Sequence, residues 1–230
     1  MENKNWKAWL YLLPAIAFLG VFMVYPLADV LVYSFEEGYN SASQTFFGTG
    51  LYNYSYVLHD PYFLQAVKNT FILVIITVPV STGIALLISL GLNSIRRLRE
   101  LYQTVFFLPY VTNTLASVRQ DYYNAAKIDG TSKWRIFTRI TLPMISPMIF
   151  YLIITGFIGA FKAYSDEVAL FGTDLNAAGM NTIVGYVYDM LYGDSGGYPS
   201  YASAAALILF AIVFTITVIN LLISRKNVHY

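Results

Sequence analysis

The feature that most constrains this chain is a set of long stretches without a charged residue. Four of them run from Trp9 to Ala28, Asn69 to Ile95, Ile140 to Phe161 and Ala202 to Ser224. Each is long enough to span a membrane, because a bilayer core of about 30 Å needs about 20 apolar helical residues. With 12% charged and 57% hydrophobic residues, the chain has too few polar groups to cover a soluble fold. The sequence therefore predicts a membrane protein and excludes a water-soluble enzyme.

The spans are predicted to be helices, because the apolar runs are continuous and do not alternate as lipid-facing β-strands do. The expected fold is an all-α polytopic membrane helix bundle, with residues 1–230 as one transmembrane domain. The predicted spans are residues 9–34, 69–95, 144–163 and 202–224, with 101–118 as a weaker candidate. Pro109 and Asn113 interrupt that fifth segment.

Lysine and arginine are distributed unevenly between the spans. Basic residues cluster before the first span, after the second, in the loop 119–143 and after the last, whereas 35–66 has none and 162–203 has one. The positive-inside rule therefore places both termini and both basic loops in the cytoplasm.

This orientation leaves a parity problem. The basic loop after the second span and the basic loop 119–143 are both placed in the cytoplasm, so an even number of crossings must separate them. Only one candidate crossing, residues 101–118, lies between them. Either this segment enters the membrane and returns on the same side, or a further crossing is missing from the sequence. We favour a missing crossing, because re-entrant backbone needs shielding that little of this chain can provide.

The loop 119–143 is the most specific feature of the sequence. It is expected to form two short helices joined at the Asp129-Gly130 turn, with Thr131 or Ser132 capping the second. Pro143 disfavours helix at Leu142, so we expect a break before the next span. The composition of the loop suits docking on a soluble partner, and an interfacial hairpin at the lipid headgroups is the alternative.

The spacing of small residues, glycine and proline in this loop resembles the "EAA" loop of permease subunits in binding-protein-dependent ABC importers. Ala125-Ala126 is followed after three residues by Gly130, and after nine more by Ile140-x-Leu142-Pro143. Asn124 stands where the family usually has Glu, so only a hydrogen-bonding role is expected there. Trp9–Pro14 in the first span and Phe107–Tyr110 are similar to the sugar-importer branch. The coupling residues implied by the resemblance are Tyr122, Tyr123, Asn124, Ala125, Ala126, Asp129, Gly130, Ile140, Leu142 and Pro143.

The resemblance implies a type I importer permease in a bacterial cell membrane, moving a sugar or related polar solute by alternating access. It also implies a second permease subunit, separate ABC ATPase subunits and an extracytoplasmic solute-binding protein as partners. No phosphate-binding loop is present, so ATP is expected to be hydrolysed by the ATPase and no cofactor to be bound by this chain. Six-span relatives have a complete third and fourth helix before the EAA loop, whereas Leu115-Ala116 here almost directly precedes Asp121.

The solute pathway is harder to locate. Phe157, Phe161 and Tyr164 alternate with small residues near the outer end of a span and could stack on a sugar ring. Helix packing through small residues, with an interfacial aromatic belt, explains the same pattern.

Other function classes fit the sequence less well. An ion-coupled transporter needs ionisable groups deep in the membrane, and only Asp29 lies within a span, near its end. His59 and His229 fall on opposite sides, so neither a catalytic nor a metal site is expected, and a net charge of +1 disfavours nucleic acid. A non-transporting membrane scaffold stays open as an alternative.

Overall fold

The computed structural model describes residues 5–94, 120–193 and 196–227, which divide into two compact units. The first unit consists of residues 1–70 and 163–211, and the second of residues 71–162 and 212–230. Two long helices, α4 (Pro61–Ser94) and α12 (Pro199–Asn227), begin in the first unit and continue into the second. The prediction of one domain over the whole chain stays a prediction.

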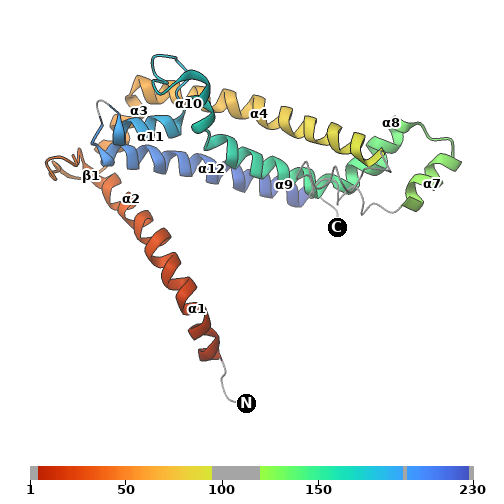
Figure 1. Cartoon of the computed structure of the whole chain (residues 1–230), viewed down its shortest axis with the longest axis horizontal. Coiled ribbons are helices and arrows are strands. Elements are labelled where there is room, and N and C mark those ends of the chain that lie inside the picture. Colours follow the sequence, from red (N-terminus) through yellow and green to blue (C-terminus); the bar gives the residue numbers. More distant parts are fainter. Residues whose placement is uncertain (1–4, 95–119, 194–195, 228–230) are drawn as a thin grey trace. The chain divides into compact units, whose positions relative to one another are not determined.

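The described part of the chain is mostly helical (Figure 1). The first unit also contains α1 (Asn5–Leu19), η1 (Gly20–Val24), α2 (Tyr25–Phe35), β1 (Glu36–Glu37), β2 (Gly48–Thr49), α3 (Tyr52–His59), α10 (Ser165–Phe171) and α11 (Ile183–Tyr192). The second unit contains α7 (Gln120–Ile128), α8 (Lys133–Ile136), η2 (Phe137–Thr141) and α9 (Leu142–Phe161).

Four helical segments are long and apolar enough to cross a membrane: Trp9–Phe35, Pro61–Ile88, Lys133–Phe161 and Pro199–Ile223. They correspond to the four firmly predicted spans, and the all-α prediction is confirmed. At most 11% of the most apolar window in any of them is buried within this chain, which fits helices that face lipid or partner subunits. The predicted segment 101–118 lies outside the described residues.

The second span begins earlier than predicted, at Pro61 instead of residue 69. Proline is favoured in the first helical turn because its missing N–H would have no partner there. The preceding Asp60 accepts a hydrogen bond from the Tyr62 backbone N–H at 2.9 Å and thereby caps the helix. The sequence prediction placed the start too late because it counted only residues without charge, and the first turns of this helix include a charged residue.

Two π-helical turns lie directly before prolines in the spans. In η1 the Tyr25 N–H bonds to the Gly20 carbonyl before Pro26, and in η2 the Leu142 N–H bonds to the Phe137 carbonyl before Pro143. A proline inside an α-helix loses one hydrogen bond and clashes with the carbonyl four residues earlier. The wider turn provides the local adjustment that lets the helix continue. The expected break at Leu142 is therefore wrong, and α8, η2 and α9 form one continuous helix.

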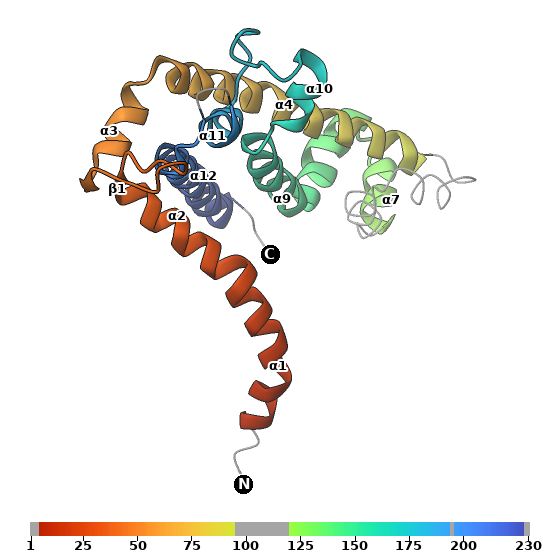
Figure 2. The ribbon, with the colours of Figure 1, turned by 60° about the vertical axis from the view of Figure 1, so that its left-hand side comes forward.

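In the first unit, Asn53 organises the short β-hairpin that follows α2. The strands pair antiparallel, with Glu36 opposite Thr49, and Figure 2 shows the hairpin beside the end of α2 and α3. The buried Asn53 amide donates to the carbonyls of Ser34 and Glu36 at 3.0 and 2.9 Å. Its oxygen accepts from the Gly38 N–H at 3.0 Å, so one side chain satisfies backbone groups on both sides of the helix end.

A second set of contacts fastens α11 to the start of α4 in the same unit. The buried Tyr186 hydroxyl donates to Asp60 at 2.7 Å, and its ring packs against Phe63. Burial raises the pKa of Tyr186, and its hydrogen bond to Asp60 acts in the same direction. The Ile183 N–H donates to the Thr70 hydroxyl at 3.0 Å. These bonds connect the loop after α10 to the beginning of a span.

Replacing Asn53 with alanine is expected to destabilise the first unit. The buried carbonyls and the Gly38 N–H would lose their partner, at a cost of about 2–3 kcal/mol, so the melting temperature of the purified protein should fall by about 5 °C or more. Asn40→Ala is the matched control, because the Asn40 side chain makes only exposed bonds, to the N–H groups of Ala42 and Ser43. Equal melting temperatures for the two variants would contradict the organising role of Asn53.

Candidate functional site: a helical hairpin before the third described span

The helix α7 begins and ends with sequence features suited to its position. Asp121 lies in the first turn and Lys127 in the last, where their charges complement the helix dipole. At the other end, the Gly130 N–H bonds to the Lys127 carbonyl and the Thr131 N–H to the Ala126 carbonyl, both at 3.0–3.1 Å. This pair of bonds is a Schellman motif, which needs a left-handed residue, and Gly130 has φ +67°.

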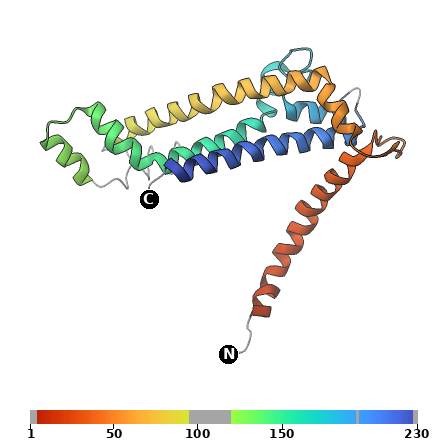
Figure 3. The ribbon, with the colours of Figure 1, turned by 180° about the vertical axis from the view of Figure 1, so that it is seen from behind.

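The chain then turns into α8, so that α7 and α8 form a hairpin, seen from behind in Figure 3. Ser132 has an extended backbone, and its hydroxyl accepts a hydrogen bond from the Arg135 N–H at 3.4 Å. The prediction that Thr131 or Ser132 caps the second helix is therefore confirmed, with Ser132 as the cap. We call residues 120–141 the coupling hairpin below, after the role that the sequence predicts for them.

Tyr123 anchors α7 to the helix that follows. Its hydroxyl shares a hydrogen bond with the buried Thr141 hydroxyl at 3.1 Å, and its ring packs on the buried Ile145 near the start of α9. Leu86 of α4 and Ile149 and Leu152 of α9 pack against the same Ile145. The coupling hairpin is thus fastened to α9 of the second unit at Ile145, on which Leu86 of α4 also packs.

A hollow of about 440 Å³ lies between the two arms of the coupling hairpin. On one side it is lined by residues of α7 and the residue directly after it, spaced about one turn apart so that they share one face: Tyr122, Ala125, Ala126 and Asp129. The turn and the opposite arm contribute Thr131, Arg135, Arg139 and Ile140. The two alanines leave the space that larger side chains would fill.

The predicted coupling residues fall into three groups. Tyr122, Ala125, Ala126, Asp129 and Ile140 line the hollow. Tyr123 and Gly130 shape the coupling hairpin, while Asn124 is exposed and Leu142 and Pro143 begin α9. Arg135, Arg139 and Thr141 were not among the predicted residues, although the one-turn spacing of the two arginines indicates a shared face. The assignment of these residues to coupling stays a prediction.

The three residues predicted to line the solute pathway are divided between the two units. Phe161 is buried, with its ring edge-to-face on Phe71 at 5.4 Å, and Phe157 lies one turn earlier on α9. Tyr164 belongs to the other unit, where its ring lies 5.1 Å from Tyr188 of α11. Burial raises the pKa of Tyr164, with Tyr188 and Asp189 contributing in the same direction. A role in solute contact stays a prediction for all three.

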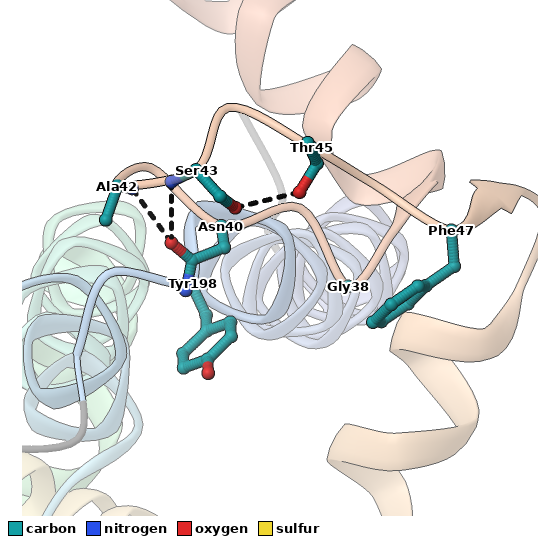
Figure 4. Close-up of a pocket in the computed structure, with 7 residues that line it drawn as sticks. All are labelled: Gly38, Asn40, Ala42, Ser43, Thr45, Phe47 and Tyr198. Carbon is teal, nitrogen blue, oxygen red and sulfur yellow. Dashed lines mark hydrogen bonds between the residues drawn. The ribbon is translucent and has the colours of Figure 1, made fainter.

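A second hollow, of about 480 Å³, lies in the first unit beside the loop between β1 and β2 (Figure 4). Its lining includes Tyr198 and the polar residues Asn40, Ser43 and Thr45. Asn40 accepts the N–H groups of Ala42 and Ser43, and the Ser43 and Thr45 hydroxyls bond each other at 2.8 Å. Its polar groups are therefore largely used within the loop.

The fold and the coupling hairpin define a multi-pass membrane protein in which a basic helical hairpin is attached to the span that follows it. The sequence profile of one family, described as binding-protein-dependent transport system inner membrane component, matches residues 70–228. The match covers more than half of the chain, which therefore belongs to this family of membrane-embedded permease subunits of ABC transporters.

Several permeases of known transport systems are similar over nearly the whole chain. A lactose transport system permease protein of Rhizobium radiobacter is 28% identical, covering 94% of this chain and 92% of its own length. An arabinooligosaccharide permease protein of Bacillus subtilis (strain 168) is 23% identical, covering 96% and 90%. An sn-glycerol-3-phosphate permease protein of Yersinia enterocolitica is also 23% identical, covering 98% and 96%.

The alignments are longer than this chain. They extend over 282, 288 and 290 residues for these three relatives, whereas the chain has 230. Each relative therefore has positions with no counterpart here, which agrees with the prediction of a missing crossing.

Two crystal structures of a bacterial alginate ABC transporter have the same fold. One, in complex with a periplasmic protein carrying an alginate pentasaccharide, matches with a TM-score of 0.77 and 17% identity, covering 97% of this chain and 95% of that chain. The other matches with a TM-score of 0.78 and 18% identity, covering 97% and 96%. The predicted type of fold, that of an ABC importer permease, is confirmed.

Replacing Gly130 with valine is expected to loosen the turn of the coupling hairpin. No atom lies within 4 Å of the place where a Cβ would be, so the effect comes from the backbone alone. Holding a branched residue at φ +67° costs about 1–2 kcal/mol, whereas asparagine tolerates this region. Hydrogen–deuterium exchange of the Gly130 and Thr131 amides should be faster in Gly130→Val and nearly unchanged in Gly130→Asn. The same exchange in both variants would argue against this account of the turn.

Proposed function

We propose that this chain forms one half of a transmembrane pathway that imports a sugar or a related polyhydroxylated solute. In this scheme an extracytoplasmic binding protein delivers the solute, a second permease completes the pathway, and separate ATPase subunits drive it. The observation that carries the proposal is the coupling hairpin, which is fastened to α9 at Ile145, where Leu86 of α4 also packs, in a chain that belongs to the permease family. The solute class is supported by relatives named for lactose and arabinooligosaccharides.

The energy source lies outside this chain in the proposed mechanism. The sequence contains no phosphate-binding loop, and the described residues include no cluster of acidic, histidine or cysteine side chains suited to a metal. We therefore propose that the chain has no catalytic activity and binds no cofactor. ATP is hydrolysed by the partner subunit, and its movement reaches this chain through contact.

In this proposal the apolar cluster around Ile145 transmits the movement of the ATPase to the spans. An ATPase that displaces α7 pulls on the Tyr123–Thr141 hydrogen bond and on the packing between Tyr123 and Ile145. Because Leu86 of α4 packs on the same Ile145, both spans receive the displacement. Close-packed side chains transmit such shifts well, since they resist compression. The spans can then alternate between inward-open and outward-open arrangements.

The proposal also fixes the side of the membrane on which each part lies. The basic coupling hairpin and both termini face the cytoplasm of a bacterial cell, and the loops that carry α3, α10 and α11 face outward. The charge distribution supports this orientation, because the outer segments 35–66 and 162–203 together contain one lysine and no arginine.

A second candidate is a permease-like subunit that assembles with partners without transporting. The alignments with relatives favour it, because they contain more positions than this chain has residues. An uptake assay separates the two candidates. Accumulation of a sugar that depends on this chain supports import, whereas assembly without uptake of any sugar in a panel supports the scaffold.

Placing a charge between the arms of the coupling hairpin is expected to uncouple transport. Ala126 is 7% exposed, so the carboxylate of an Ala126→Asp variant would meet α8 and η2 and disturb the docking face. Uptake should fall at least about tenfold while membrane insertion is kept, and ATP hydrolysis should no longer respond to solute. Ala178→Asp, the same change at an exposed outer alanine, serves as the control. Normal uptake with Ala126→Asp would contradict the coupling role.

The proposed orientation can be tested with single cysteines, since the natural chain has none. In intact cells, a membrane-impermeant thiol reagent should label an Ala178→Cys variant and leave a Thr131→Cys variant unlabelled. Opening the cells should make the Thr131→Cys variant reactive. Labelling of that variant from outside would place the coupling hairpin on the wrong side and refute the mechanism.

A further inference from the structure

We propose that the hollow of the coupling hairpin receives a carboxylate side chain of the ATPase subunit, held by Arg135 and Arg139. The inference rests on the proposed function, and it adds the chemistry of the contact.

The first observation is the charge of the hollow. Asn124 on the neighbouring helix face is exposed and neutral, so it adds no charge to the surface of the coupling hairpin. Among the charged residues of the hollow, Arg135 and Arg139 outnumber Asp129 by two to one.

The second observation is that the two guanidinium groups are available. Both arginines are exposed, and neither guanidinium has a hydrogen-bond or ion-pair partner among the described residues. They are four residues apart across α8 and η2, so both reach the same opening. Arginine presents several N–H donors in a planar fork that fits both oxygens of a carboxylate.

The third observation is the shape of the site and its surroundings. The alanines on α7 leave about 440 Å³ between the arms, which is room for the end of one acidic side chain. Tyr122, Ile128 and Trp134 remain 49%, 86% and 73% exposed on the same coupling hairpin. Arginine with exposed aromatic and apolar residues is the composition of a protein interface centre. An acidic side chain that enters the hollow would be surrounded by such a surface.

Charge reversal in the hollow tests the proposal on the assembled transporter. The ATPase retained by the purified complex in detergent should fall about tenfold or more for the double variant Arg135→Glu/Arg139→Glu. Lys133→Glu is the matched control, because Lys133 is an exposed cation of the same hairpin that does not line the hollow. It should change retention less than about twofold, as exposed charges contribute little. Equal retention in the double variant and the control would overturn the proposal.

A zero-length carbodiimide cross-link identifies the partner group directly, because it joins an amine only to a carboxylate in contact. In an Arg139→Lys complex, the new amine should be linked to an aspartate or glutamate of the ATPase and located by mass spectrometry. An assembled complex that gives no such link would refute the site. A double variant that keeps the ATPase but loses binding to anionic phosphatidylglycerol vesicles would assign the hollow to lipid headgroups and overturn the proposal as well. Absence of ATPase from the natural complex would instead count against the proposed function.

Discussion

The contact between Tyr123 and the start of α9 is the interaction on which the proposed coupling depends. A helix as short as the nine residues of α7 is marginally stable in water unless tertiary contacts support it. Here the support comes from the Tyr123–Thr141 hydrogen bond and the packing of Tyr123 on Ile145. Without it the turn at Gly130 would still form locally, but α7 would have no defined direction relative to the spans, because only the other arm of the hairpin is continuous with α9.

The two units are held together internally by different means. In the first, polar side chains such as Asn53, Asn69 and Thr70 satisfy backbone groups of short loops and helix ends. In the second, apolar packing around Ile145 and between Phe71 and Phe161 dominates. The difference follows from the local structure: irregular loops leave backbone groups that need partners, whereas continuous helices satisfy their own and are left with apolar surface to bury.

The number and positions of the four described spans could be predicted from the sequence because a bilayer imposes a length and excludes charge. Their starts were less predictable. The second span begins at the Asp60-Pro61 cap, earlier than predicted, and the π-helical turn η2 lets the helix continue through Pro143, where a break was expected. The loop motif identified most of the coupling hairpin. Its anchor was not foreseen, because no periodicity connects Tyr123 to Thr141, eighteen residues later. The hollow was missed for the same reason, since it forms only when Arg135 and Arg139 fold back toward α7.

The helix α9 joins the coupling hairpin to the predicted pathway residues Phe157 and Phe161. Its 20 residues extend about 30 Å. Ile145 contacts the coupling hairpin near its beginning, and Phe161 is buried against Phe71 of α4 at its end. A tilt imposed at Ile145 therefore displaces the far end of the same rigid element, where Phe157 and Phe161 lie. Because Phe71 belongs to the span whose Leu86 packs on Ile145, a movement of α9 against α4 must change the packing at both ends. A solute contact at Phe161 would require that aromatic pair to open, which makes access to this residue depend on the position of the coupling hairpin.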